Sequence, residues 1–148
     1  MKWIWLALLT VALALASGCQ TAQRQQVRIL TYNIHHAEGI DGKLDLPRIA
    51  QVIQSVNPDV VVLQEVGKET ERTGKVDQAA ELGRLTGMQA VFGKAMDYQG
   101  GGYGLAVLSR WPILESHTHS LPAPGAREPR ALLLTRIQAG EDGPLFWF

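Results

Sequence analysis

Several stretches of the chain alternate or group their apolar side chains in the way that β-strands do. Residues 27–34 (VRILTYNI) place β-branched and aromatic side chains in rough alternation, which predicts a strand. Residues 59–64 (DVVVLQ) carry an unbroken apolar run, which predicts a central strand that is covered on both faces. Shorter strands are predicted at 89–92 and 104–109, joined by a glycine-rich loop, and further strands at 113–121, 131–137 and 145–148.

Two other segments are predicted to be helices, and the first of them repeats apolar side chains at intervals of three and four residues, which is the spacing of an amphipathic helix. Each follows an aspartate that can cap the first free N–H groups, and each is followed by residues that stop a helix. The predicted helices are 46–56, between Asp45 and Asn57-Pro58, and 78–86, between Asp77 and Gly87. Residues 67–76 are polar and predict an exposed loop. The order strand–helix–strand–helix, followed by strands, predicts an α/β fold with a mixed sheet.

The N-terminus has the features of an export signal and is kept apart from the fold. Lys2 precedes an apolar run at 3–16 that is too short for an ordinary membrane-spanning helix. Small residues then precede Cys19, the only cysteine, and this pattern resembles a bacterial lipoprotein signal in which Cys19 becomes the lipid-modified N-terminus. We expect an exported lipoprotein of the cell envelope, held at the membrane by its lipid and facing the periplasm or outer membrane. The expected parts are a signal peptide at 1–18, a polar tether at 19–26 and a domain at 27–148. The alternative is an ordinary secretory peptide with an incidental cysteine.

The charge balance limits the classes of partner. Lys and Arg together number 14, as do Asp and Glu, so the formal net charge is zero. Without a basic excess, the chain lacks the sequence-wide phosphate footprint of a typical nucleic-acid binder. Local basic residues are still sufficient for a small phosphorylated substrate.

The two predicted strands at the start of the domain both end in polar side chains. Asn33 lies at the end of the first strand, and Glu65 follows the second. Parallel strands joined by a helix bring their carboxyl ends to the same edge of a sheet, where ligand sites form in α/β folds. A carboxylate and an amide oxygen are hard ligands that suit Mg²⁺ or Mn²⁺. The competing interpretation is that Asn33 caps a turn and Glu65 is a solvated strand end.

The order of the motifs supports the metal site. The chain contains TYNIHH, DLPRIAQVI, PDVVVLQEV, a helix that begins with DQ, TGM, YGLAVLSRWPI and REPRALL. In this order they resemble the endonuclease/exonuclease/phosphatase family of metal-dependent phosphoesterases, over residues 27–138. The resemblance implies a four-layer αββα sandwich with mixed sheets and hydrolysis of phosphodiester or phosphomonoester bonds with Mg²⁺ or Mn²⁺. It also implies that Glu65 is a direct metal ligand and that Asn33 helps to bind the metal-site water or the phosphate.

Four further features have both a functional and a structural interpretation. Arg130 in REPRALL either binds substrate at the rim of the site or forms a surface salt bridge. His36 either lines the pocket or is packed by its neighbours. His117 and His119 alternate on one strand face and could bind a metal as a pair, although no third ligand is apparent. The glycines at 100–102 could cradle a phosphate, but a flexible turn is the better interpretation because no helix follows them.

The resemblance covers the first half of the family's fold. The family's later motifs, a THL-like strand, a D-x-N motif and a final Asp-His pair, do not occur in this sequence. A truncated sandwich is expected to expose the inner face of a sheet, and therefore to form oligomers or to need a complementing second half. Two functions follow as hypotheses. One is a phosphoesterase acting on nucleic acid, a phospholipid head group or a small phosphate ester. The other is a non-catalytic, truncated lipoprotein that acts as a binding or remnant module.

Overall fold

The computed structural model describes residues 26–125, 128–140 and 143–148. The expected signal peptide at 1–18, the lipidated Cys19 and all but the last residue of the tether at 19–26 lie outside the described residues. Within the described part of the chain, neither helix combines the length and the apolar character that crossing a bilayer requires.

The first sheet has four strands and is mixed, as the order of elements predicts. Its strands follow the order β1-β2-β4-β3, with bounds Ile29–Asn33 (β1), Val60–Lys68 (β2), Gly101–Ser109 (β4) and Gln89–Tyr98 (β3). β1 and β2 are parallel, and the other neighbours are antiparallel. Because β1 and β2 are parallel, their carboxyl ends lie at the same edge of the sheet.

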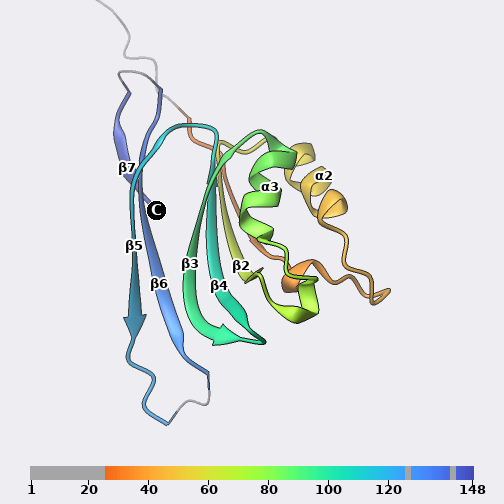
Figure 1. Cartoon of the computed structure of the whole chain (residues 1–148). Coiled ribbons are helices and arrows are strands. Elements are labelled where there is room, and N and C mark those ends of the chain that lie inside the picture. Colours follow the sequence, from red (N-terminus) through yellow and green to blue (C-terminus); the bar gives the residue numbers. More distant parts are fainter. Residues whose placement is uncertain (1–25, 126–127, 141–142) are drawn as a thin grey trace, which may run out of the picture.

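Two helices cover one face of this sheet (Figure 1). They are α2 (Leu46–Val56) and α3 (Gln78–Thr86). Both predicted N-caps are confirmed, since the Asp45 carboxylate accepts the Arg48 N–H at 2.9 Å and the Asp77 carboxylate accepts the Ala80 N–H at 3.1 Å. The apolar side of the helices packs on the sheet in a core that includes Ile49, Ile53, Val61, Leu63, Leu82 and Leu108.

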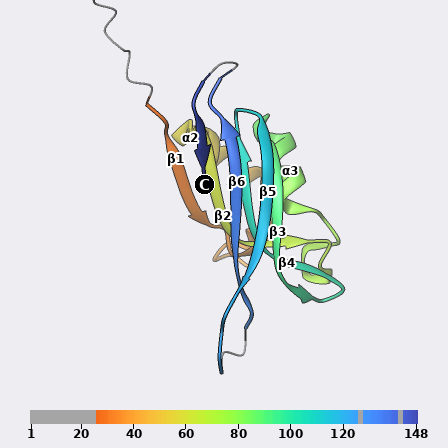
Figure 2. The same ribbon diagram turned by 90° about the vertical axis from the view of Figure 1, so that its left-hand side faces the viewer.

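A second, antiparallel sheet lies on the other face of the first, so that helices, first sheet and second sheet form three successive layers (Figures 1 and 2). Its strands follow the order β5-β6-β7, with bounds Ile113–Leu121, Arg130–Gln138 and Leu145–Trp147. Val60, Val107, Leu133 and Ile137 are buried between the sheets. Val60, Val61 and Leu63 of β2 are fully buried on its two faces, which confirms the interpretation of the apolar run as a central strand. The arrangement agrees with the αββα sandwich that the family resemblance implies.

The glycine-rich segment is not the loop that the sequence predicts. β3 and β4 extend through it to a tight turn at Gln99 and Gly100, where both residues have positive φ. Gly101 and Gly104 lie within β4, and a Cβ atom on either would collide with backbone atoms, of Lys68 for the first and of Gly93 for the second. These glycines therefore permit close approach of neighbouring strands, and neither a phosphate cradle nor a flexible turn is needed to explain them.

The exposed apolar surface differs in position from the expectation. The inner faces of the two sheets are covered by each other over β2, β4 and β6, although Ile29 on β1 stays exposed. Other exposed apolar side chains lie on the outer face of the second sheet: Leu132, Leu145 and Trp147. The expectation of a bare inner face is wrong for most of the sheet because the hairpin β5–β6 folds back over it. A surface of this kind is typical of a contact with another element or chain.

Candidate active site

The side chains of Asn33 and Glu65 meet at the carboxyl edge of β1 and β2. The Asn33 amide Nδ2 donates a hydrogen bond to Glu65 Oε1 at 2.8 Å. In a regular strand Glu65 would point to the face opposite Gln64, which is the residue paired with Asn33. A β-bulge between Gln64 and Val66 removes this restriction, and Glu65 adopts a φ of 60° there. The bulge therefore turns the carboxylate toward Asn33.

Asn33 uses both ends of its amide. Its Oδ1 accepts the backbone N–H of His35 at 2.9 Å, while its NH₂ group holds Glu65. This pattern assigns the oxygen and nitrogen of the amide, since a carboxylate can accept and cannot donate when it is ionised. Asn33 thus connects the carboxylate to the turn that follows β1. The predicted role of Asn33, to help bind the metal-site water or the phosphate, stays a prediction. The two hydrogen bonds of its amide are suited to orienting the Glu65 carboxylate.

The turn η1 (His35–Ala37) has an unusual backbone. His35, His36 and Ala37 have φ values of 45°, 43° and 65°, which place three successive non-glycine residues in the left-handed region. Such conformations are energetically costly, and they concentrate at functional sites where the surrounding structure holds them. Here the buried Gln78 side chain holds the turn: its Nε2 donates to the His36 carbonyl at 2.7 Å, and its Oε1 accepts the Gly67 N–H at 2.8 Å.

His36 is buried, with an exposed fraction of 6%. Only one of its two ring nitrogens has a hydrogen-bond partner among the described residues. Its Nε2 contacts Glu38 Oε2 at 3.1 Å, while Nδ1 is buried and has no partner among the described residues. Burial lowers the pKa of His36, and the Glu38 carboxylate, which accepts a hydrogen bond from the imidazole, acts in the opposite direction. A neutral imidazole is the form of histidine that binds metal ions, because one of its ring nitrogens has a free lone pair. His36 is thus packed by its neighbours and is not among the residues that line the cavity at Glu65, so its predicted part in substrate binding stays a prediction.

The donor set fits a divalent cation. His35, His36 and Glu65 each offer one ligand atom, and these atoms lie within 4.8 Å of one another. A carboxylate together with imidazole nitrogens suits Mn²⁺ and other transition ions, and the carboxylate with water also suits Mg²⁺. The orphaned Nδ1 of His36 is a buried atom that a ligand would satisfy. His35 is a residue that the sequence reasoning missed, although its place beside His36 in TYNIHH was visible.

A cavity of about 370 Å³ opens beside this group. Asn33 and Glu65 line it from the first sheet, and Arg130 lines it from the start of β6 in the second sheet. Arg130 also pairs with Glu128, with 3.0 Å between Nη1 and Oε1, so it lies at the rim of the site and in a surface salt bridge at once. Tyr103 of β4 lines the same cavity and was not anticipated. The position of Arg130 is compatible with its predicted part in substrate binding, which stays a prediction.

His117 and His119 do not join this group. They lie on the face of β5 whose partners across the strand pair are Leu134 and Leu132, which is the outer face of the second sheet. Their ring centroids are 6.4 Å apart, and His117 Nε2 contacts Glu115 Oε1 at 2.6 Å. Neither lines the cavity at Glu65.

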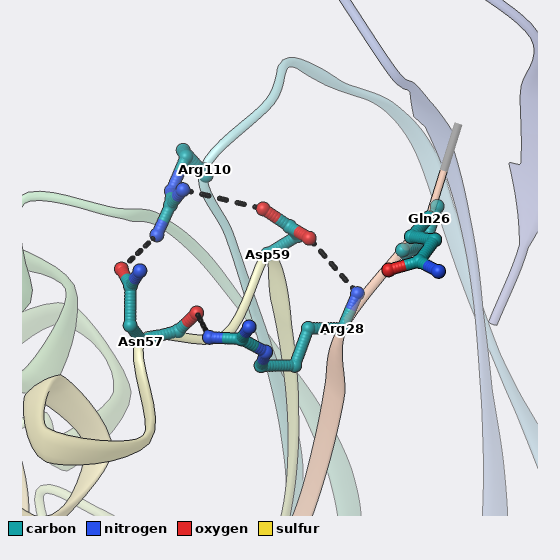
Figure 3. A pocket seen from close by; sticks show the side chains of 6 residues that line it. Gln26, Arg28, Asn57, Asp59 and Arg110 are labelled. Carbon is teal, nitrogen blue, oxygen red and sulfur yellow. Dashed lines mark hydrogen bonds and ion pairs between the residues drawn. The ribbon is translucent and has the colours of Figure 1, made fainter. Parts of the chain in front are cut away.

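A larger hollow of about 530 Å³ lies at the opposite edge of the first sheet (Figure 3). Its charged groups are bonded to one another: the Asp59 carboxylate accepts the Arg28 N–H at 2.9 Å and pairs with Arg110 at 3.3 Å. Arg110 also donates to Asn57 Oδ1 at 2.6 Å. Because the polar atoms satisfy each other, this network ties the amino ends of β1 and β2 to the end of β4. The network has a structural role, and the larger volume of this hollow does not by itself make the hollow a functional site.

The chain belongs to the Endonuclease/Exonuclease/phosphatase family, whose sequence model matches residues 30–148. The resemblance that the motifs indicate is therefore confirmed.

Individual relatives agree with this assignment. The chain is 28% identical over 123 residues to the uncharacterized protein YbhP of Escherichia coli (strain K12), a match that covers 78% of this chain and 48% of YbhP. Among solved structures, an endonuclease/exonuclease/phosphatase from Beutenbergia cavernae DSM 12333 is 28% identical, with a TM-score of 0.65 over 84% of this chain and 37% of that one. The mannosyl-6-phosphatase Bt3783 of Bacteroides thetaiotaomicron VPI-5482 shares the fold at 20% identity, with a TM-score of 0.62 over 83% of this chain and 50% of that one. The chain thus spans about half the length of the curated relatives it matches.

Proposed function

We propose that this chain carries the metal-binding part of a phosphoester hydrolase that depends on Mg²⁺ or Mn²⁺. One observation carries the proposal: in a chain of this family, the Glu65 carboxylate lies with His35 and His36 at a strand edge and opens onto a cavity. The backbone at Glu65 and at both histidines is held in the left-handed region, and costly conformations of this kind concentrate at functional sites.

Each residue of the site has a proposed part. Glu65 holds the divalent ion, with the neutral imidazoles of His35 and His36 as further donors. Asn33 fixes the orientation of the Glu65 carboxylate through its amide. Arg130, at the rim of the cavity, binds a phosphate oxygen of the substrate. When bound, the ion supplies Lewis-acid polarisation of a phosphoryl oxygen.

The substrate is proposed at the level of the bond, a phosphodiester or a phosphomonoester. A cavity of about 370 Å³ is large enough for a phosphate group and part of its ester. The balanced charge of the chain favours a compact phosphate ester over a long nucleic acid, because no excess of basic residues is available to follow a phosphate backbone. That one structural relative is a mannosyl-6-phosphatase is compatible with a phosphorylated sugar as substrate.

The proposal is tested by metal dependence. The chain is assayed on bis-p-nitrophenyl phosphate and p-nitrophenyl phosphate after treatment with EDTA, and again after addition of Mg²⁺ or Mn²⁺. We expect hydrolysis that EDTA abolishes and that either ion restores, because the carboxylate and imidazoles would then be without their ion. Absent activity, or activity that EDTA leaves unchanged, contradicts the proposal and favours the alternative of a non-catalytic binding or remnant module.

We also propose that the protein is a lipoprotein attached to the cell envelope through Cys19. The support is the sequence alone: a positive residue, an apolar run at 3–16, and small residues directly before the single cysteine. Bacterial cells that express the full chain are grown with labelled palmitate, beside cells that express Cys19→Ala. We expect label on the chain with Cys19 and none on the variant. Equal labelling of both chains, or none of either, would leave Cys19 without this role.

A further inference from the structure

Arg72 is a cation held between two aromatic rings close to the candidate site. It belongs to the turn η2 (Glu71–Thr73), and its guanidinium carbon lies 4.5 Å from the ring centroid of Tyr98 and 5.0 Å from that of Tyr103. The neighbouring carboxylate of Glu71 pairs with Lys75 instead, at 3.8 Å. Nε of Arg72 is buried and has no hydrogen-bond partner in the described part of the chain. The guanidinium is thus stabilised mainly by the two rings.

The backbone fixes where this cation lies. The Arg72 N–H donates to Gln99 Oε1 at 3.0 Å, and the Glu71 N–H donates to the Gln99 carbonyl at 3.1 Å. Both bonds tie η2 to the turn between β3 and β4. Because Tyr98 ends β3 and Tyr103 lies near the start of β4, the same two bonds set the guanidinium against their rings.

Tyr103 connects this cation to the candidate site. It lines the cavity together with Asn33, Glu65 and Arg130, and Arg72 does not. Burial raises the pKa of the Tyr103 phenol, the Glu65 carboxylate raises it further, and Arg72 opposes both as a nearby cation and hydrogen-bond donor. The phenol is therefore protonated at neutral pH. A guanidinium has donors and no acceptor, so Arg72 cannot take up the Tyr103 phenol proton, which is left for another partner.

An oxyanion in the cavity needs hydrogen-bond donors, and two of the lining donors already serve carboxylates. The Asn33 NH₂ group is bonded to Glu65, and Arg130 is paired with Glu128. The phenol of Tyr103 is a lining donor that is not committed in this way. Leu105, two residues further along β4, lines the cavity and contributes no polar atom.

We propose that Tyr103 is a substrate-binding residue whose hydroxyl donates a hydrogen bond to a phosphate oxygen of the bound ester, and that Arg72 is the positioning residue that holds the Tyr103 ring in place. The inference rests on the proposed function, because it adds a contact to the same site. It also assigns a purpose to a half-buried arginine that has no acidic partner among the described residues, since the guanidinium orders a ring at the edge of the cavity.

The test compares three variants of the full chain: Tyr103→Phe, Arg72→Lys and Tyr98→Phe. Tyr98→Phe is the matched control, because it removes a phenol hydroxyl from the other ring that contacts Arg72 but does not line the cavity. Binding of inorganic phosphate is measured by titration calorimetry in the presence of Mn²⁺, and Mn²⁺ binding is measured separately. Thermal unfolding of each variant shows whether the fold is retained.

We expect Tyr103→Phe to weaken phosphate binding about tenfold, the usual effect of one hydrogen bond to a charged group, with Mn²⁺ binding unchanged. Arg72→Lys keeps the charge and loses the planar stacking group, so it should weaken phosphate binding in the same direction. Tyr98→Phe should stay within about twofold of the unsubstituted chain, since it keeps the ring and removes no lining donor. In the hydrolysis assay, Tyr103→Phe should raise KM more than it lowers kcat.

Three outcomes would overturn the inference: equal effects of Tyr103→Phe and Tyr98→Phe, a loss of Mn²⁺ affinity in Tyr103→Phe with phosphate affinity retained, or a chain that binds no phosphate. The second outcome would mean that the phenol serves Glu65 instead of the substrate. Failure of the proposed function has a different signature. A chain that binds phosphate through Tyr103 and hydrolyses no ester refutes the hydrolase and keeps the contact.

Discussion

Replacing Glu65 by glutamine is expected to reduce metal-dependent phosphoester hydrolysis by roughly a hundredfold to a thousandfold. The substitution keeps the length of the side chain and an oxygen that can accept the Asn33 hydrogen bond, and it removes the negative charge that holds a cation. The left-handed backbone at this position already bears a side chain of this shape, so no new strain is introduced. Initial rates with saturating Mn²⁺ measure the effect, and Mn²⁺ titration followed by electron paramagnetic resonance measures the loss of binding.

The matched control for this substitution is Glu69→Gln. Glu69 also has a positive φ and follows β2 by one residue, but it is exposed and does not line the cavity beside Asn33. We expect the control to retain its hydrolysis and its Mn²⁺ binding. If both glutamine variants retain activity, then Glu65 is not the metal ligand and the proposed site is wrong.

Replacing Gln78 by methionine is expected to lower the free energy of unfolding by about 2–6 kcal/mol, because two buried backbone groups would lose their partner at a cost of about 1–3 kcal/mol each. These groups are the Gly67 N–H and the His36 carbonyl, and the side chain that joins them is 2% exposed. Methionine is nearly as long as glutamine, so the space stays filled. Urea denaturation followed by circular dichroism measures the change.

The same variant should impair the site, because Gln78 holds the strained turn that carries His36. We expect weaker Mn²⁺ binding at temperatures where the variant is still folded. Gln54→Met is the control: Gln54 lies exposed on α2 and donates one hydrogen bond to the Leu85 carbonyl at 3.0 Å. It should change the stability by less than about 1 kcal/mol. Equal stability loss in the two variants would show that Gln78 has no special part in the fold.

Local side-chain chemistry was enough to predict both helices and their caps. Asp45 and Asp77 cap them as expected, and Gly87 ends the second helix with a φ of 71°. The unbroken apolar run of β2 identified the central strand, because burial on both faces requires apolar side chains at successive positions. The glycine-rich segment misled the prediction. Glycine at a turn and glycine beneath a neighbouring backbone have the same sequence signature, and only the contacts of Gly101 and Gly104 distinguish them.

The candidate site also has one part that the sequence predicted and another that only the tertiary structure shows. Parallel strands joined by a helix must end at one edge, so the order of elements in the sequence was sufficient to place Asn33 and Glu65 near each other. Their contact at 2.8 Å depends on a bulge, and the bulge depends on how β2 pairs with β4. The pairing of η1 with Gln78 and the stacking of Arg72 on Tyr98 and Tyr103 join residues far apart in the chain. Helix caps and strand patterns are set by neighbours along the chain and can be predicted from it. Contacts between distant segments are decided by packing and register, and therefore appear only in the tertiary structure.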